Sequence, residues 1–297
     1  MIINIIISTA AALVFSPLLI GIINKTKAFF SGRRGSPFFQ MYFDLYRLLK
    51  KDAVRSGTTT IVFILAPVIV FCCTLAAAVL IPISPGTGII SFTGDFVLLF
   101  YLLGLARFFL IISALDTGSS FEGMGASREA FFSAMAEPVV FISILTILRL
   151  NGTTSFTDAL GGGGAGNWII ISLATVPFFI VMLAENARIP FDDPNTHLEL
   201  TMIHEVMILD NSGRGLALME WAASIKLWLF SLIIVRIILP GSVLSFLLTF
   251  VIAVIIGIVE SVIARTTLLK IPQLLFSAGI IAFLGFFLSF SKIFVWS

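Results

Sequence analysis

The segment 184–210 concentrates side chains that could carry out acid–base chemistry. Its ionisable residues are Glu185, Arg188, Asp192, Asp193, His197, Glu199, His204, Glu205 and Asp210. Long apolar runs precede and follow this polar stretch. Charged groups at a membrane border are costly to bury and usually serve a function there. We therefore expect the segment to couple chemistry done by a partner outside the bilayer to ion movement inside it.

Composition places the chain in a lipid bilayer. Of its 297 residues, 59% are hydrophobic and 11% are charged, and the mean hydropathy is +1.11. A water-soluble domain could not bury so much apolar surface. Apolar runs near the roughly 20 residues that cross a bilayer recur along the chain, and helices satisfy the backbone in lipid. The sequence predicts an all-α, polytopic membrane protein with about eight transmembrane helices and a single transmembrane domain over residues 1–297.

The basic residues predict how these helices are oriented. The expected spans lie near residues 1–23, 58–81, 95–115, 129–150, 168–184 and 216–239, a seventh ends near 264, and an eighth starts at about 273. Lys and Arg are densest between the first two spans, and such an excess marks cytoplasmic loops. Both termini are then outside an inner or plasma membrane. In the first cytoplasmic loop, residues 38–51 mix aromatic and charged residues, which predicts an amphipathic surface helix. Residues 116–129 and 151–167 are expected to form loops.

The polar segment does not fit a soluble-enzyme motif. His204 begins like the zinc-protease motif HExxH, but Ile208 stands where the second histidine is required. His197 and His204 are seven residues apart, roughly 10 Å along a helix, which is too far to share one metal ion. The two cysteines, at 72 and 73, lack iron–sulfur or zinc spacing, and the net charge of +2 does not argue for nucleic acid. We expect no metal site, no nucleic-acid binding and no catalysis by this chain alone.

Helix capping and surface pairing explain only part of the polar segment. Asp193 and Thr196 can cap a helix, and Thr196 with Glu199 matches a capping box. Arg188 and Asp192 can pair at the surface, where an ion pair contributes roughly 0–1 kcal/mol.

Other charged groups have no such explanation. These acids are Glu137, Glu185, Glu205 and Glu220. Buried carboxylates can carry a proton near neutral pH, and several linked by water form a plausible proton relay. An arginine such as Arg188 or Arg128 could switch their proton affinity by approaching or withdrawing. Arg107 lies alone in the middle of its span, so it must face protein or water.

Several motifs resemble one family of membrane subunits. Residues 184–192 read AENARIPFD and resemble the signature AE-x-x-R-x-PFD of subunit 1 of respiratory complex I. The continuation at 193–205, DPNTHLELTMIHE, is closer to the energy-converting, membrane-bound [NiFe] hydrogenases, including formate hydrogenlyase. DTGS at 116–119, GMGASRE at 123–129 and ESVIARTTLLKIP at 260–272 are similar to the same branch. The resemblance covers nearly the whole chain.

The resemblance implies a membrane-anchor subunit that carries no cofactor. The [NiFe] centre and iron–sulfur clusters would lie on partners, the large and small hydrogenase subunits at the cytoplasmic face. Antiporter-like membrane subunits would be neighbours, and electron transfer would drive H⁺ or Na⁺ outward. The implied ion-translocation relay comprises Glu137, Glu185, Glu199, Glu205, Glu220, Asp116, Glu260 and Lys226. The implied coupling and docking residues are Arg33, Arg34, Arg128, Arg188, Asp192 and Asp193.

Two alternatives remain open at this point. The chain could be the quinone-site subunit of a complex I-like dehydrogenase, although Asn195, Thr196 and His197 stand where complex I has further acids. It could also be a stand-alone secondary transporter. Such transporters usually contain internal repeats and broken helices around a midplane site.

Overall fold

Helices are the regular secondary structure in the part of the chain that the structure describes. The computed structural model describes residues 2–54, 56–82, 91–161, 167–192, 202–240 and 244–290. Its α-helices are α1 (Ile2–Phe30), α2 (Gln40–Lys50), α3 (Ile61–Leu80), α4 (Asp95–Asp116), α5 (Ser120–Asn151), α6 (Phe156–Gly161), α7 (Trp168–Glu185), α8 (Gly213–Ile238), α9 (Ser245–Val262) and α10 (Ile271–Leu288). Two short 3-10 helices, η1 (Glu205–Ile208) and η2 (Leu268–Lys270), complete these ranges, which contain no strand. The predicted all-α class is confirmed.

Eight helices within the described ranges are long and apolar enough to cross a membrane. They are α1, α3, α4, α5, α7, α8, α9 and α10 together with η2. The predicted number of about eight is therefore confirmed, although α1 continues past its expected end near residue 23 to Phe30. The side of the membrane that each terminus faces stays a prediction.

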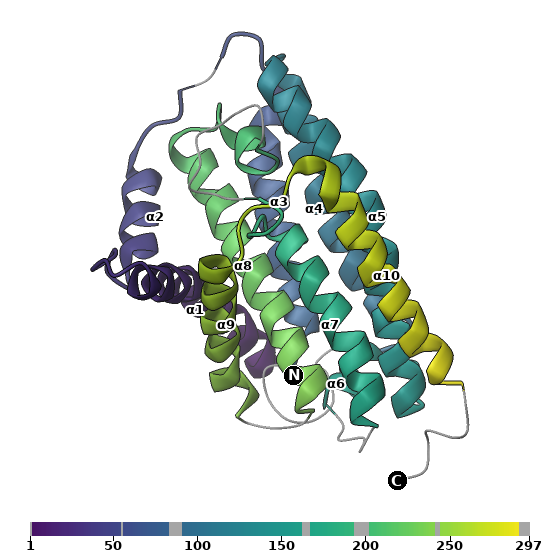
Figure 1. Cartoon of the computed structure of the whole chain (residues 1–297). Helices are drawn as coiled ribbons and strands as arrows, with labels where there is room; N and C mark the ends of the chain where they lie inside the picture. The colour runs from purple at the N-terminus through teal and green to yellow at the C-terminus, as the bar shows by residue number, and fades with distance from the viewer. Residues whose placement is uncertain are drawn as a thin grey trace.

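Helix α8 lies in the middle of the bundle (Figure 1). It packs against α1, α2, α3, α7 and α9 and is buried over most of its length. Small residues such as Ala217, Ala222 and Ser224 allow neighbouring backbones to approach closely. Because the helix is surrounded by protein, its charged residues Glu220 and Lys226 face other helices and not lipid.

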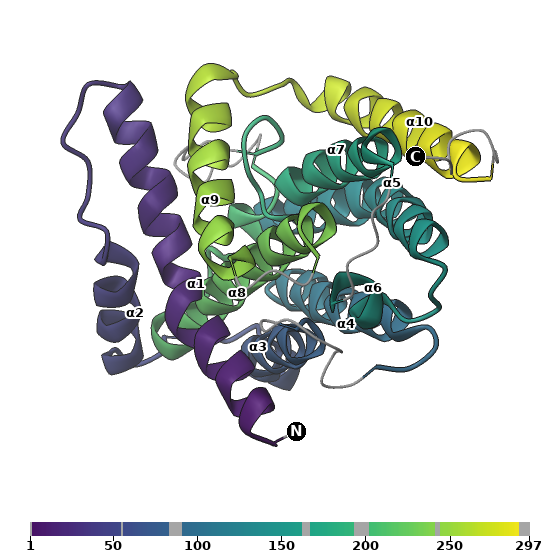
Figure 2. The same ribbon diagram turned by 90° about the horizontal axis from the view of Figure 1, so that it is seen from below.

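Helix α1 crosses the bundle at a steep tilt. Figure 1 views α1 almost end-on, whereas Figure 2 shows its length beside α9. Helix α2 stands next to α1, and the Tyr42 hydroxyl of α2 donates a hydrogen bond to the carbonyl of Val14. Leu45 faces inward, whereas Phe43 and Tyr46 are exposed. This two-sided pattern suits the predicted surface helix, whose position on the membrane stays a prediction.

Helix α5 begins inside the predicted loop 116–129. It runs for 32 residues from Ser120, about 48 Å at 1.5 Å per residue, and so exceeds a bilayer core of about 30 Å. Gly125 is helical, and the Val206 side chain and Ile203 carbonyl occupy the space that a Cβ would need. The loop prediction was wrong because this glycine permits close packing against η1 and does not form a turn.

The other predicted loop, 151–167, also contains fixed structure. Asp95 of α4 accepts hydrogen bonds from the backbone N–H groups of Phe156 and Thr157, at 2.6 and 3.0 Å, and from the Ser155 hydroxyl at 2.8 Å. The buried carboxylate thus holds the start of α6 against α4. Of the glycine run 161–164, Gly161 ends α6, and residues 162–164 lie outside the described residues.

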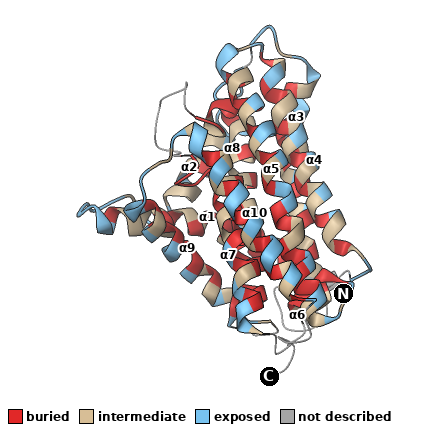
Figure 3. Ribbon diagram, turned by 45° about the vertical axis from the view of Figure 1, so that its right-hand side comes forward, coloured by how far each residue is buried: buried red, intermediate tan, exposed pale blue. Residues whose placement is uncertain are grey.

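The outer surface of the bundle is apolar. Buried residues lie on the inward faces of the helices, and exposed ones lie on the outward faces (Figure 3). Large apolar or aromatic side chains are among the exposed ones, including Tyr101, Phe108, Phe276 and Phe283. A soluble protein rarely exposes such contiguous apolar surface. Together with the eight apolar helices, this surface identifies a multi-pass membrane protein.

Candidate functional site

Arg107 of α4 is the centre of a charged cluster. Its guanidinium lies 2.5 Å from a carboxylate oxygen of Glu137, 2.5 Å from Glu185 and 3.6 Å from Glu129. Glu129 and Glu137 belong to α5, and Glu185 ends α7. The side chains of Arg107, Glu129 and Glu185 are 10%, 10% and 5% exposed, so these two ion pairs are shielded from bulk solvent. A planar guanidinium with five donors suits this task, because one side chain must reach several carboxylates.

Lys226 joins the cluster to α8. Its Nζ lies 2.8 Å from the Glu185 carboxylate and donates a 2.7 Å hydrogen bond to the Glu185 carbonyl. Glu185 therefore contacts cations from two different helices, α4 and α8. The cluster as a whole joins α4 and α5, which are consecutive in the sequence, to α7 and α8.

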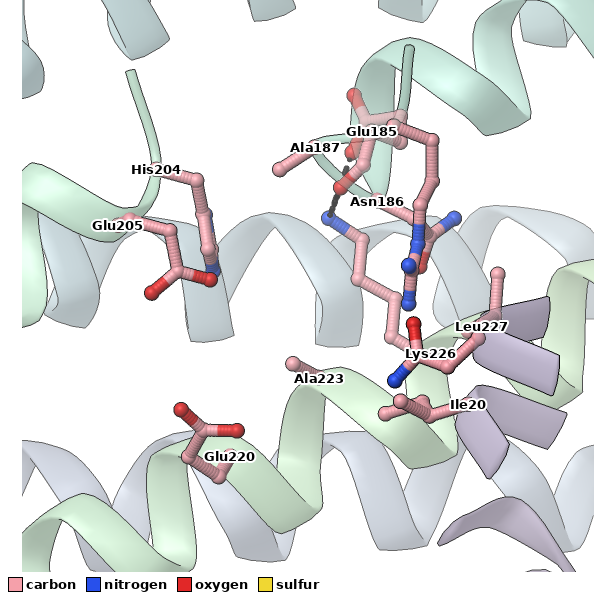
Figure 4. Close-up of a pocket in the computed structure, with 12 residues that line it drawn as sticks. Ile20, Glu185, Asn186, Ala187, His204, Glu205, Glu220, Ala223, Lys226 and Leu227 are labelled. Atoms are coloured by element: carbon pink, nitrogen blue, oxygen red, sulfur yellow. Dashed lines mark hydrogen bonds and ion pairs between the residues drawn. The ribbon is translucent and has the colours of Figure 1, made fainter. Parts of the chain in front are cut away.

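A cavity of about 240 Å³ adjoins Lys226. Glu205 of η1 and Glu220 of α8 extend into this space, with His204 beside Glu205 and the Lys226–Glu185 ion pair across from them (Figure 4). A second, smaller cavity of about 40 Å³ has Arg107 and Glu129 in its lining. His204 and Lys226 line both cavities. Each cavity is large enough to hold water, which needs about 10–15 Å³ of accessible space.

The surroundings of η1 shift the pKa of one of its acids, Glu205, toward neutral pH. Loss of solvent raises the pKa of Glu205 to about 7, and the negative charges of Glu220 and Asp192 act in the same direction against the Arg188 charge. Loss of solvent also lowers the pKa of His204 to about 4, assisted by the positive charge of Lys226. At pH 7, Glu205 is thus divided between its two protonation states while His204 is neutral. A carboxyl of this kind can both accept and release a proton.

Ion pairs fix the loop that connects these groups. Asp192 accepts hydrogen bonds from the backbone N–H groups of Ile203 and His204, at 2.9 and 3.1 Å, and pairs with Arg265 at 3.0 Å. The Pro190 carbonyl accepts a hydrogen bond from the Thr266 hydroxyl at 2.9 Å. The loop after α7 is therefore attached both to η1 and to the segment after α9.

A second set of ion pairs joins α1 to the same loop. The Glu260 side chain of α9 is fully buried, 2.8 Å from Lys27 Nζ and 3.6 Å from Arg188. Arg188 and Asp192 are 8% and 1% exposed. The expected surface pair between them is therefore wrong, because both side chains lie inside the protein.

The predicted relay residues that the structure describes fall into three groups. Glu185, Glu205, Glu220 and Lys226 gather around the 240 Å³ cavity. Glu137 touches the cluster through Arg107, but its side chain is 48% exposed on the side of the bundle. Asp116 and Glu260 lie elsewhere: Asp116 accepts hydrogen bonds from the Thr60 N–H and hydroxyl, at 2.7 and 2.9 Å, at the start of α3. Glu199 lies outside the described residues.

The predicted docking residues are also divided. Arg33 and Arg34 are exposed in the connection between α1 and α2. Arg128 donates a 2.8 Å hydrogen bond to the Met202 carbonyl and so contacts the chain before η1. Arg188 and Asp192 are the buried loop residues described above, and Asp193 lies outside the described residues.

Sequence reasoning missed some members of the cluster. Glu129 was placed at a loop border, because the start of α5 was not recognised. Arg107 was expected to face protein or water, which indicated that partners existed but not which ones. His204 was identified as part of the polar segment, but the sequence did not indicate that it lines both cavities. Within the described ranges, no group of three or more His, Cys, Asp or Glu residues is arranged to hold a metal ion.

Comparison with known proteins identifies related sequences over most of the chain. The family model described as NADH dehydrogenase matches residues 2–290. Hydrogenase-4 component C of Escherichia coli (strain K12) is 32% identical over 231 residues, which are 77% of this chain and 72% of that protein. Formate hydrogenlyase subunit 4 of the same organism is 29% identical over 288 residues, covering 91% and 93% of the two chains.

More distant similarities agree with this assignment. A subunit of the NADH-quinone oxidoreductase of Hyphomonas neptunium (strain ATCC 15444) is 31% identical over 180 residues, covering 54% of this chain and 49% of that protein. A chain from the membrane-bound sulfane sulfur reductase, an archaeal respiratory membrane complex, shares the fold with a TM-score of 0.84 at 19% identity, covering 97% and 99% of the two chains. The resemblance that the motifs indicated is confirmed: this chain belongs to the NADH dehydrogenase subunit 1 family of membrane proteins.

Proposed function

We propose that this chain is the membrane subunit of an energy-converting [NiFe] hydrogenase complex, where it couples electron transfer in a cytoplasmic module to H⁺ or Na⁺ translocation. The similarity to hydrogenase-4 component C and formate hydrogenlyase subunit 4 supports this type of complex. The observation that carries the coupling role is Arg107, which bridges three carboxylates beside a cavity lined by Glu205 and Glu220.

The coupling begins at η1, which lies outside the membrane-spanning helices. A partner that presses on η1 or on the loop after α7 changes the distance between Glu205 and Glu220. Two carboxylates that approach each other cannot both stay ionised at low cost, so one takes up a proton. When they separate, the proton is released into the cavity and can pass along water toward Lys226 and Glu185.

Lys226 transmits the charge change to the membrane interior. Its ammonium pairs with Glu185 at the edge of the cavity, and Arg107 holds the other side of the same carboxylate. Movement of Lys226 toward a newly ionised Glu205 or Glu220 weakens its hold on Glu185. Arg107 then redistributes among Glu129, Glu137 and Glu185, which moves charge toward the side of the bundle where Glu137 is half-exposed. An antiporter-like membrane neighbour would accept the ion there.

The proposal includes specific partner subunits. Large and small hydrogenase subunits, carrying the [NiFe] centre and iron–sulfur clusters, would dock on the face that contains Arg33 and Arg34. The pairs Asp192–Arg265 and Glu260–Arg188 attach the loop to neighbouring segments, and through these contacts motion at the docked face would be passed on to η1. In this proposal the docked face lies in the cytoplasm and both termini lie outside.

The decisive experiment uses the native complex. A tagged chain would be purified from membranes, its co-purifying subunits identified by mass spectrometry, and the complex reconstituted in liposomes. The proposal requires a hydrogenase module and ion uptake that depends on hydrogen turnover. Recovery of the chain without any redox subunit, or transport by the chain alone, would contradict it and favour a secondary transporter.

A second candidate is the quinone-site subunit of a complex I-like dehydrogenase. The similarity to the NADH-quinone oxidoreductase subunit of Hyphomonas neptunium favours it. The charged cavity lining, with Glu205, Glu220 and Arg188, suits water and ions better than an apolar ring system. Quinone-dependent turnover by the purified complex, with no hydrogen formed or consumed, would select this candidate.

A further inference from the structure

A buried carboxylate in the last turn of α9 takes no part in the charged cluster or in the lining of its cavities. The Glu260 side chain is fully buried. Within the described ranges neither of its oxygens has a hydrogen-bond partner, so its charge is balanced by ion pairs with Lys27 and Arg188. A buried charge is costly unless opposite charges lie close to it. The positions of these two cations are therefore tied to Glu260.

The two cations share this carboxylate unequally. Lys27 Nζ lies 2.8 Å from one oxygen of Glu260, whereas the nearest guanidinium nitrogen of Arg188 lies 3.6 Å from the other. The Arg188 Nε atom has no hydrogen-bond partner among the residues that the structure describes. A separation of 3.6 Å is longer than a hydrogen bond. The Arg188 guanidinium is thus held less firmly than the Lys27 ammonium.

Arg188 also faces the acids of the larger cavity. It lines the 240 Å³ cavity together with Glu205 and Glu220. Its positive charge opposes the rise in the pKa of Glu205 that burial causes. Lys226, the other cation in the described lining, already lies 2.8 Å from the Glu185 carboxylate. Arg188 is therefore the cation best placed to move between Glu260 and the acids of the cavity.

Other charged or titratable groups surround η1 but do not connect it to α1. They are Glu220 and Lys226 on α8, Glu185 at the end of α7, Asp192 in the loop after α7, Arg107 on α4, Glu122, Arg128 and Glu129 on α5, and His204 and Asp210 beside η1. Of the charges around η1 in the described ranges, Arg188 alone forms an ion pair with Glu260.

Close helix packing holds Lys27 opposite Glu260. Helix α1 lies beside α9 (Figure 2). A Cβ atom on Gly257 would overlap the side chain of Thr26, so the two backbones approach closely about one turn from Glu260. Only glycine permits this approach. A displacement of this end of α1 would therefore move Lys27 relative to Glu260.

The exposed segment after α1 is attached to the same end of the helix. Lys25 Nζ donates a 2.8 Å hydrogen bond to the Arg34 carbonyl, and the Arg33 N–H donates one of 2.8 Å to the Ala28 carbonyl. These two arginines are the exposed residues predicted to dock a partner. Lys27 thus lies between the predicted docking segment and the carboxylate that it shares with Arg188.

We propose that Lys27 and Glu260 are positioning residues that set how far the Arg188 guanidinium reaches toward Glu205. While Lys27 lies close to Glu260, the carboxylate is balanced and Arg188 stays at the cavity. When the end of α1 moves away, Glu260 draws Arg188 out of the cavity, and Glu205 binds a proton more tightly. The proposal rests on the proposed function, in which Glu205 exchanges the proton, but its test requires neither hydrogen turnover nor ion uptake.

The test is an infrared pH titration of the full chain reconstituted in lipid. The carbonyl stretch of the protonated Glu205 carboxyl is followed against pH and identified as the band that Glu205→Gln lacks. The wild type should titrate with a midpoint of about 7. Lys27→Met should raise this midpoint by roughly one pH unit, because Arg188 moves toward Glu260. Glu260→Gln should lower it by a similar amount, because Arg188 is released toward Glu205.

The double variant distinguishes positioning from the action of charge at a distance. If Lys27 acts by controlling Arg188 through Glu260, it has no effect once residue 260 is neutral. Lys27→Met/Glu260→Gln should then titrate like Glu260→Gln alone. Two charges that act separately would have additive effects, which nearly cancel because their signs are opposite. A double variant that titrates like the wild type would overturn the proposal.

Two lysine variants serve as controls. Lys27→Arg keeps a positive charge opposite Glu260 and should restore the wild-type midpoint. Lys270→Met makes the same charge change as Lys27→Met at an exposed residue after α9, and should leave the midpoint in place. An unchanged midpoint in Lys27→Met, or an equal shift in Lys270→Met, would contradict the proposal. If Glu260→Gln does not fold, these three lysine variants decide the question.

Discussion

Replacement of Glu205 by glutamine tests the electrostatic account of the polar segment. The substitution keeps the shape of the side chain and removes its titration. We expect it to abolish ion uptake coupled to hydrogen turnover and to leave assembly of the complex intact. The physical reason is that Glu205, with its pKa raised to about 7, is the group at the cavity that exchanges protons near neutral pH.

The same pKa predicts a change in the pH dependence of stability. Below pH 4.5, the ordinary value, Glu205 is protonated in both the folded and unfolded chains. Between pH 4.5 and about 7 only the unfolded chain loses this proton, so the free energy of unfolding falls as pH rises. Each pKa unit is worth 1.36 kcal/mol, so the full loss is about 3 kcal/mol and is complete above pH 7. Glu205→Gln removes this loss and should stabilise the protein most at pH 8.

The measurement is thermal or denaturant unfolding of the purified protein at pH 5 and pH 8. The difference between the variant and the wild type should grow by about 3 kcal/mol over this range. Asp210→Asn is the matched control, because it removes a carboxylate from an exposed position near η1. Parallel curves for Glu205→Gln and the wild type would refute the burial argument. Unchanged ion uptake in vesicles would remove Glu205 from the relay.

Three further changes test other parts of the structure. Arg107→Gln leaves Glu129 and Glu185 buried with fewer partners, so it should cost on the order of 3–5 kcal/mol in unfolding measurements and stop ion uptake, whereas Arg149→Gln should do neither. Charge reversal at Arg33 and Arg34, in the densest basic stretch, should release the soluble module, and a pull-down that recovers the full complex would disprove this docking role. Asp95→Asn removes a buried acceptor of backbone N–H groups at α6, and should lower the unfolding free energy by about 2–3 kcal/mol while ion uptake by the folded fraction stays normal.

Hydrophobicity and charge placement made the fold predictable. Apolar runs of sufficient length predicted the eight spanning helices, because in a bilayer the backbone of such a segment must satisfy its own hydrogen bonds, as a helix does. Gly125 was misleading, because a glycine that permits close packing and a glycine in a turn look the same in a sequence. The role of Asp95 was not predicted either, because no local sequence pattern marks a buried carboxylate that accepts hydrogen bonds from backbone N–H groups.

The candidate site was predictable in its components but not in its pairing. Glu185, Glu205 and Glu220 were identified because no local cap or surface pair explains them. Their partners Arg107 and Lys226 come from other helices, and which helices meet depends on packing that no local pattern encodes. Glu260 was predicted as a relay residue, but the sequence did not show its partners. Its pairing with Lys27 and Arg188 links α1, α9 and the loop after α7, which suits a positioning role.

The most direct measurement of the coupling role is the number of ions moved per molecule of hydrogen formed. The purified complex would be reconstituted in liposomes, and the Lys226→Met variant compared with the wild type in the same preparation. Lys226 connects the cavity to Glu185 and Arg107, so we expect the variant to keep hydrogen formation while ion uptake falls to the passive leak. An unchanged ratio of ions to hydrogen in the variant would show that ions do not pass through this charged cluster.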